Sequence, residues 1–391
     1  MLSFNLGSSS LKFSLFLMGE KETLLARGEV ERIALRGGRF RMRDPEGRVL
    51  EDAQGEFREH ETAVSAVFSA LKRLALPRPS AVGHRVVHGG PAHASPAIIG
   101  PRLLEELKGL VHFAPLHLPY EIRCMEAVAS HFPEIPQVAC FDTAFHRRMP
   151  EVAQRFPLPG SFWDEGVRRY GFHGLSYEYI LSALAAEKPG RLVIAHLGNG
   201  ASMAAVKNGL PLDTTMGFTP TGGFMMGTRS GDLDPGVLLY LMAEKKYDAQ
   251  KMARLVNHQA GLLGVSGISP DMKTLLDRRR DDPRAALAVD MFCYHARRHL
   301  GALAAVLGGL DTLVFTGGIG ERAAPVRQDI CRGLEHLGIH LDPDRNGLDP
   351  DKNGAHSAVI SGPASPCKVM IIPTNEDLVI ARHTFKLVTA N

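Results

Sequence analysis

The chain has 391 residues, of which 45% are hydrophobic and 22% charged, and its 45 basic and 42 acidic side chains give a formal net charge of +3. This length suits two domains with apolar cores of their own, and the balanced charge argues against nucleic acid or a membrane as a partner. Five cysteines without a CxxC spacing predict neither a disulfide framework nor a thiolate zinc site. Residues 1–10 lack the pattern of a signal peptide, and no uncharged apolar stretch could span a bilayer, so we expect a cytoplasmic protein.

The first part of the chain predicts strands followed by alternating helices and strands. Apolar runs predict strands at Leu2–Leu6, Leu11–Met18, Thr23–Ile33, Ala81–Val87 and Gln137–Phe141. A glycine-serine turn at residues 7–10 joins the first two of them. Apolar residues at helical spacing predict helices at Glu59–Leu76, Leu103–Leu110 and Tyr120–His131.

The second part repeats this alternation, which is typical of an α/β protein. We expect a helix at Ser176–Glu187, with Ser176 as its N-cap. Strands are expected at Arg191–Leu197, Ser202–Lys207, Leu210–Thr214, Thr312–Thr316 and Lys368–Ile372. Asn208-Gly209 is a strong two-residue hairpin signal between two of these strands. Helical patterns cover Ala285–Leu307, Ala324–Leu337 and Asp377–Leu387.

Two short turns suggest an internal duplication. Residues Asn5–Ser10 resemble His196–Ala201, and each segment follows an apolar strand and opens a second one. A duplication would give two similar domains facing across a cleft.

The same turns are candidates for binding phosphate, because Gly and Ser aim backbone N–H groups and hydroxyls into one concavity. The alternative is that they simply close hairpins. No GxxxxGK[ST] occurs, so neither turn is a Walker loop. A third glycine run, Thr316–Glu321, lies between a strand and a helix and does not match GxGxxG, which disfavours an NAD oxidoreductase.

Two arginines and two carboxylates lie at positions that suit phosphoryl chemistry. Arg85 lies in a strand of small and apolar residues, and Arg229 lies in a glycine-flanked loop. Guanidinium groups there could grip a carboxylate or phosphate, or could form structural salt bridges. Asp142 and Glu376 follow predicted strands, where a carboxylate can hold Mg²⁺ or cap a helix.

Taken together, these motifs resemble the acetate kinase family over essentially the whole chain. The resemblance is carried by Asn5–Lys12, Gly83–Gly90, Phe141–His146, Arg169–Gly174, His196–Gly200, Met216–Asp232, Gly317–Glu321 and Thr374–Glu376. It implies an α/β protein of two ribonuclease H-like domains, of the acetate and sugar kinase, Hsp70 and actin superfamily, with a central nucleotide cleft. The implied domains are residues 1–146 with the C-terminal helix 377–391, and residues 147–376.

The resemblance also implies the roles of individual residues. It assigns catalysis to Arg85, His117, Asp142, His173 and Arg229. It assigns the apolar pocket for the acyl chain to Val87, Leu116, Phe172 and Pro220. It assigns the metal to Asn5 and Glu376. It assigns ATP binding to Lys12, His196, Leu197, Gly198, Asn199, Gly200, Asp271, Met272, Lys273, Gly318, Ile319, Gly320, Glu321 and Arg322.

The implied activity is the reversible, ATP-dependent phosphorylation of acetate to acetyl phosphate, with ATP and ADP as co-substrates. Mg²⁺, or Mn²⁺ in its place, would be the metal, and the protein would be a homodimer. The carboxylic acid substrate is already ionised at pH 7, so no base has to remove a proton from it. Asp142 is therefore expected to act through magnesium or by orienting an arginine, and not as a proton acceptor.

Two alternatives to this activity stay open. The first is a propionate kinase or another kinase of short-chain fatty acids, because one methylene changes binding little. The second is a nucleotide-dependent conformational module, which would need neither the two arginines nor an acyl pocket. The chain departs from the family pattern at Leu118, Leu175, Tyr177, Lys273 and Arg322, which bears on acyl-chain and nucleotide preference.

Overall fold

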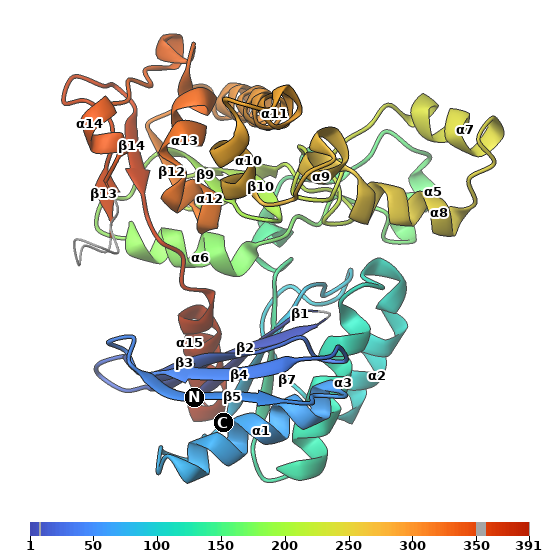
Figure 1. Cartoon of the computed structure of the whole chain (residues 1–391), viewed down its shortest axis with the longest axis vertical. Coiled ribbons are helices and arrows are strands. Elements are labelled where there is room, and N and C mark those ends of the chain that lie inside the picture. Colours follow the sequence, from blue (N-terminus) through green and yellow to red (C-terminus); the bar gives the residue numbers. More distant parts are fainter. Residues whose placement is uncertain (8, 349–356, 391) are drawn as a thin grey trace. The chain divides into compact units, whose positions relative to one another are not determined.

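The computed structural model describes residues 1–7, 9–348 and 357–390 (Figure 1). Ser8, in the first glycine-serine turn, lies outside the described residues. The chain forms two compact units, one of residues 1–145 and 375–391 and the other of residues 146–374. Asn375 and Glu376 therefore belong to the first unit, and His146 belongs to the second. The short helix η2 (Phe145–Arg148) contains the boundary.

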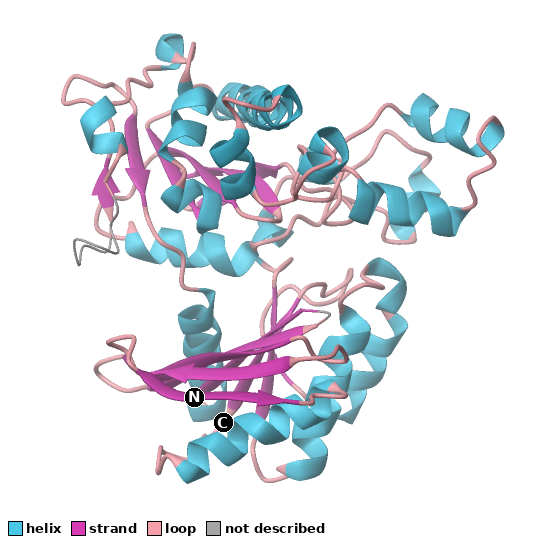
Figure 2. Cartoon of the chain, viewed as in Figure 1, coloured by secondary structure: helices cyan, strands magenta, loops and turns pink. Residues whose placement is uncertain are grey.

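The first unit is an eight-stranded sheet with helices packed on it (Figure 2). Its strands are β1 (Leu2–Gly7), β2 (Ser10–Leu17), β3 (Thr23–Glu31), β4 (Gly38–Arg43), β5 (Val49–Gly55), β6 (Val82–Val86), β7 (Ala97–Ile98) and β8 (Gln137–Phe141). Its helices are α1 (His60–Arg73), α2 (Pro101–Gly109), η1 (Val111–Phe113), α3 (Leu118–His131) and α15 (Glu376–Thr389). The strand order is β5-β4-β3-β2-β1-β6-β8-β7, with β1, β6 and β8 parallel.

The second unit is a six-stranded sheet with more helices. Its strands are β9 (Arg191–Leu197), β10 (Ala201–Lys207), β11 (Leu210–Thr214), β12 (Thr312–Thr316), β13 (Ala358–Val359) and β14 (Lys368–Ile371). The helices before the long helix α11 (Pro283–Leu307) are α4 (Glu151–Gln154), α5 (Gly160–Asp164), α6 (Gly174–Ala183), α7 (Pro235–Ala243), α8 (Ala249–Arg254), η3 (Leu255–Gln259), α9 (Gly261–Ser266) and α10 (Met272–Arg278). Those after it are α12 (Gly317–Arg322), α13 (Ala324–Cys331), η4 (Glu335–Leu337) and α14 (Pro343–Asn346).

The two sheets share one topology. The order β3-β2-β1-β6-β8 in the first unit matches β11-β10-β9-β12-β14 in the second, and the directions of the strands also match. The turns after Asn5 and after His196 join the first two strands of their sheets, β1 to β2 and β9 to β10. The duplication expected from these two turns is therefore confirmed.

The core of the first unit lies between its sheet and the helices α1 and α3, which pack on each other. Alternate strand residues point to that side, and the five cysteines of the chain are all buried. Helix α15 packs against β1, β6 and β8. Among the described residues, no helix is both long and apolar enough to cross a membrane.

Several predicted elements need correction. Helix α6 begins at Gly174 after the N-cap His173, so Ser176 lies inside the helix and does not cap it. The glycine run at 317–320 is itself the start of helix α12, and the helix predicted from Ala324 ends at Cys331. Strands β4 and β5 were not predicted. Helix α7 was also missed: it is apolar all round and buries none of its residues, so it has no helical period to detect.

The contact between β6 and α15 depends on a glycine. A Cβ atom at Gly83 would lie 2.2 Å from Oγ1 of Thr384 and 2.5 Å from Cγ2 of Ile380. Gly83→Ala should therefore lower the melting temperature measured by calorimetry, at a cost of about 1–3 kcal/mol for overpacking. Gly109→Ala, at the end of α2, is the matched control because no atom lies within 4 Å of its added Cβ. Equal melting temperatures for the two variants would contradict this account of the packing.

Candidate functional site

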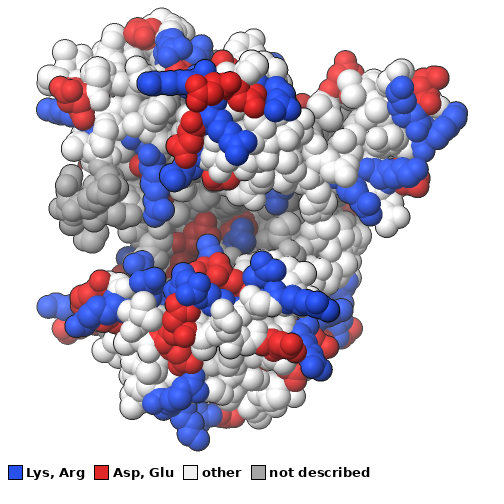
Figure 3. Space-filling model, viewed as in Figure 1, with Lys and Arg blue, Asp and Glu red and all other residues white. Residues whose placement is uncertain are grey.

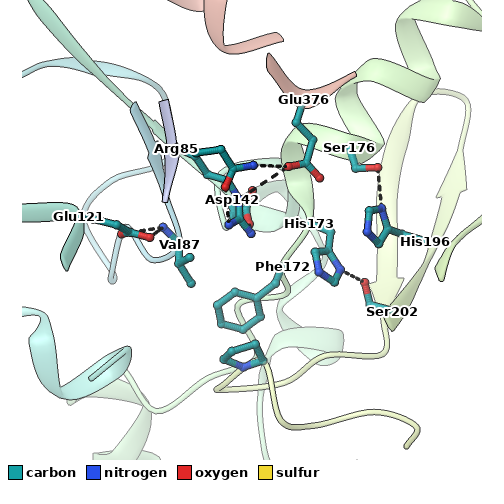
Figure 4. Close-up of polar contacts among 12 residues, drawn as sticks. Arg85, Val87, Glu121, Asp142, Phe172, His173, Ser176, His196, Ser202 and Glu376 are labelled. Carbon is teal, nitrogen blue, oxygen red and sulfur yellow. Dashed lines mark hydrogen bonds and ion pairs between the residues drawn. The ribbon is translucent and has the colours of Figure 1, made fainter. Parts of the chain in front are cut away.

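A polar cluster forms where the parallel strands of the first unit end, with Arg85 at its centre (Figure 4). Arg85 lies on β6, Asp142 directly follows β8, Asn5 lies on β1, and Glu376 opens α15. One terminal nitrogen of Arg85 forms an ion pair with Oδ2 of Asp142. Its other terminal nitrogen donates to Oδ1 of Asn5 at 3.3 Å, and Nε lies 3.8 Å from Oε2 of Glu376. Strand ends and a helix start that lie 57 to 371 residues apart in the chain thus converge on one guanidinium.

Burial shapes the charges of this cluster. Asp142 is fully buried, and the Arg85 side chain is 16% exposed. Burial lowers the pKa of Arg85, but the charges of Asp142 and Glu376 outweigh it, and the pKa is raised overall. Burial raises the pKa of Glu376, which Arg85 opposes. Arg85 therefore stays a cation, paired with the carboxyl group of Asp142.

The residues expected to hold magnesium lie side by side. Nδ2 of Asn5 donates to Oε2 of Glu376 at 3.3 Å. The described residues include no group of three or more His, Cys, Asp or Glu side chains arranged to hold a metal. One carboxylate and one amide oxygen still fit Mg²⁺, because this ion usually takes one or two protein oxygens and completes its shell with phosphates and water.

The other candidate residues of the first unit lie on β2, after β6 and at the start of α3. Val87 follows β6 and is buried, His117 is the N-cap of α3, and Leu116, just before it, is exposed. Lys12 is exposed on β2 and pairs with Asn5 across the β1–β2 hairpin. Leu118, at the family's usual Asn position, is a fully buried core residue at the start of α3.

In the second unit, two histidines stack at the β9–β10 turn. The rings of His173 and His196 lie 4.3 Å apart at 22°. Nδ1 of His173 lies 2.8 Å from Oγ of Ser202, and Nδ1 of His196 lies 2.9 Å from Oγ of Ser176 (Figure 4). The hydroxyl of Tyr177 also bonds Ser202. The predicted capping residue Ser176 thus holds a histidine instead.

The side chain of Arg229 lies close to Gly200 in the turn between β9 and β10. A Cβ atom at Gly200 would lie 3.3 Å from a terminal nitrogen of Arg229 and 3.4 Å from Nε2 of His173. That nitrogen of Arg229 donates to the carbonyl oxygen of Pro220 at 3.3 Å. The carbonyl oxygen of Asn199 accepts from the Gly227 amide at 3.0 Å, which ties the two glycine loops together. A side chain at position 200 would therefore press on both Arg229 and His173.

The third glycine run starts a helix in close contact with β9. Gly317 has φ of +76°, and a Cβ there would lie 2.8 Å from the carbonyl oxygen of Leu197. Oε1 of Glu321 accepts from the amides of Gly317 at 2.8 Å and Thr374 at 3.2 Å. The side chain of Glu321, expected at the nucleotide, therefore holds two backbone segments together. Nothing lies within 4 Å of a Cβ at Gly318, so this turn of the helix is open.

The remaining nucleotide candidates lie on helix ends. Asp271 is the N-cap of α10 and accepts from the Thr274 amide at 2.9 Å. Met272 is buried, and Lys273 is exposed 3.9 Å from Asp277. The cap explains Asp271 without a ligand.

Sequence reasoning missed three buried residues that support the site: Glu121, Ser202 and Arg327. Arg327 is 1% exposed and donates to the carbonyl oxygens of Gly320 at 2.8 Å and Glu321 at 3.0 Å. Its signal in the sequence was a single arginine on the apolar side of a helix. No comparable signal marks Ser202, because a serine in an apolar strand is ordinary.

The fold and the two polar clusters together define the class of this protein. Two sheets of one topology, each with a glycine turn between its first two strands, form the two-domain fold of the acetate and sugar kinases. The model of the acetokinase family matches residues 1–382, and the chain belongs to this family.

Individual relatives agree with this assignment. The chain is 46% identical to an acetate kinase of Rhodopseudomonas palustris, over 99% of the chain and 98% of the relative. The structure of a Porphyromonas gingivalis acetate kinase is similar with a TM-score of 0.88 and 40% identity, over 99% of both chains. The structure of a Francisella tularensis propionate kinase is similar with a TM-score of 0.90 and 34% identity, over 98% of both chains.

Proposed function

We propose that this protein catalyses the reversible transfer of a phosphoryl group from ATP to acetate, giving acetyl phosphate and ADP. Membership of the acetokinase family, with relatives named acetate kinase along the whole chain, supports this function. The observation that carries it in the structure is Arg85, a cation held at the strand ends by Asp142 and Asn5. Such a group suits an anionic substrate.

The reaction needs charge neutralisation and alignment more than proton transfer. A carboxylate oxygen of acetate attacks the γ-phosphorus while the bond to the β,γ-bridging oxygen breaks, and ADP leaves. The nucleophile is already ionised, so no base has to remove a proton. Arg85, Arg229 and His173 would bind the carboxylate and the transferring group, with His117 beside them, because preorganised donors stabilise the charge of the transition state.

Asp142 would act by orienting Arg85, since its carboxylate already binds that guanidinium. Asn5 and Glu376 would hold Mg²⁺, or Mn²⁺ in its place. When bound, the ion would neutralise charge on the phosphates of ATP. The glycine turn at 196–200, the helix start at 318–322, Lys12 and the cap at 271–273 would hold the nucleotide.

Val87, Leu116, Phe172 and Pro220 would form the pocket for the acyl chain. The main alternative is a propionate kinase, which the structural similarity to the Francisella protein favours. We infer a cytoplasmic site of action from the five buried thiols. Small anions, and not nucleic acid, suit a surface on which basic and acidic side chains are interspersed over the face shown (Figure 3).

Steady-state kinetics with acetate, propionate and butyrate test the function directly. The acyl phosphate is trapped as a hydroxamate at saturating ATP and Mg²⁺. We expect the largest kcat/KM with acetate. A larger value with propionate would favour the alternative, and ATP turnover without acyl phosphate from any of the three acids would contradict both.

Removing either arginine should abolish most of this activity. Arg85→Ala and Arg229→Ala should each lower kcat about 10²- to 10³-fold, because losing a preorganised donor costs roughly 3–4 kcal/mol. Asp142→Asn should also lower kcat at saturating Mg²⁺, because a neutral amide orients Arg85 less firmly. Arg41→Ala is the control, since this partly exposed arginine lies on β4 near Asp52, outside the Arg85 cluster. Near-normal turnover of Asp142→Asn would show that orientation of Arg85 is not essential.

We further propose that the protein is a homodimer formed through helix α7. This helix lies in an extension of the second unit with α5 and α8, and it buries none of its residues (Figure 1). Its apolar side chains Val237, Leu239, Tyr240 and Met242 are 45%, 66%, 52% and 49% exposed. A contiguous exposed apolar surface of this kind marks a protein interface.

Light scattering coupled to gel filtration tests the dimer. The protein should elute with twice the mass of its chain, and Leu239→Glu should shift it toward the monomer because a charge cannot be buried unpaired in an interface. Leu210→Glu, at an exposed hairpin position in the same unit, should leave the mass unchanged. A wild-type protein that is monomeric at micromolar concentration would contradict the proposal.

A further inference from the structure

Glu121 is a buried acid that the proposed reaction does not use. It lies in the first turn of α3 and is 1% exposed. Its two carboxyl oxygens lie 3.1 and 3.3 Å from the backbone nitrogen of Val87 (Figure 4). No described cation lies within ion-pair distance of this carboxyl group. A buried acid held only by a backbone amide needs a reason.

The hydrogen bond between the Val87 amide and Glu121 lies directly after the end of β6. The last residue of β6, Val86, pairs with Phe141 of β8, and its carbonyl oxygen accepts from the Asp142 amide at 2.9 Å. The next amide, that of Val87, has left the ladder and binds Glu121 instead. A buried amide must find a partner, so Glu121 fixes the course of the chain two residues after Arg85.

In the proposed function, both residues of this short segment would contact the substrate. Arg85 would bind the carboxylate, and Val87 would contact the acyl chain. The side chain of Glu121 therefore supports the segment from the side of α3, while Asp142 and Asn5 hold the Arg85 guanidinium. A shift of Glu121, or of Asp142 and Asn5, would move the Arg85 guanidinium relative to the side chain of Val87.

The charge of Glu121 matters as well as its position. Burial raises the pKa of Glu121 to about 8, against the effects of Arg85 and of the Val87 amide, and Asp142 adds to the rise. Cys124, one turn further along α3, is buried, and its pKa is raised by burial and by Glu121. Glu121 is therefore mostly neutral at pH 7 and ionises as the pH rises past 8. Arg85 already faces the carboxylates of Asp142 and Glu376, so a third negative charge would oppose an anionic substrate.

We propose that Glu121 is a positioning residue for the carboxylate site: in its neutral form it holds the Val87 amide, and its ionisation weakens binding of the carboxylate substrate. This inference rests on the proposed function. It predicts that the acid on α3 sets the alkaline limit of substrate binding while leaving the nucleotide site unaffected.

The test is the pH dependence of KM for acetate between pH 6.5 and 9.5, at saturating ATP and Mg²⁺. For the wild type, KM should rise about tenfold from pH 7 to 9, as expected when only the form with neutral Glu121 binds and its pKa is about 8. Meanwhile kcat and KM for ATP should change little. Glu121→Gln should keep KM near the wild-type value at pH 7 and hold it there at pH 9, because the amide oxygen still accepts from Val87 and never ionises.

Two further variants separate charge from position. Glu121→Leu removes the acceptor, so KM for acetate should be raised at every pH without the alkaline rise. Glu126→Gln is the matched control, because Glu126 lies on the exposed side of α3 near Lys108 and should keep the wild-type profile.

The outcomes separate this inference from the proposed function. A flat wild-type KM over the whole range, or an unchanged alkaline rise in Glu121→Gln, would overturn the role of Glu121 while acyl phosphate is still formed. The wild-type profile alone can do this, even when a variant fails to fold. Failure of the wild type to form any acyl phosphate would instead contradict the function itself.

Discussion

The site of the first unit depends on the ion pair between Arg85 and Asp142. A guanidinium that is mostly buried must be neutralised where it lies, and Asp142 does this from the end of the neighbouring parallel strand. The pair fixes the guanidinium plane, and Asn5 and Glu376 then complete its surroundings. Because its carboxyl group is paired with Arg85, Asp142 is not placed as a proton acceptor. The arrangement supplies a fixed positive charge with the side chains of Asn5 and Glu376 beside it, and this suits the proposed phosphoryl transfer between two anions.

The duplicated sheet explains why the polar groups of each unit gather in one place. In both sheets a hairpin of the first two strands is followed by parallel strands, so the turn and the strand ends meet at one edge. In the first unit this edge collects Asn5, Arg85 and Asp142. In the second unit the turn at Gly200 meets His173 and Arg229. One architecture, used twice, thus presents two different sets of donors.

Buried supporting residues add a second level to this arrangement. Ser202 holds His173, Arg327 holds the carbonyl oxygens at the end of α12, and Glu121 holds the Val87 amide. Each acts through a hydrogen bond to a group that sequence motifs single out. Burying the polar atoms of these residues costs free energy of folding. Well-formed hydrogen bonds offset that cost. Glu121 differs from the other two because burial raises the pKa of its carboxyl group to about 8.

The sequence by itself determined the α/β class, most strands and long helices, and the family, because apolar periodicity and glycine motifs are local properties of the chain. It also determined which residue types could do the chemistry, as with Arg85 and Asp142. It could not find strands β4 and β5, helix α7, or the role of Ser176, whose hydroxyl serves His196 and not a helix end. Only the tertiary structure decided these points, and only it revealed the hydrogen bond between Glu121 and the Val87 amide. The physical reason is that burial and hydrogen bonding between residues distant in the chain depend on how strands pair and helices pack, which no local pattern encodes; Ser176 and His196 are 20 positions apart, and Val87 and Glu121 are 34 apart.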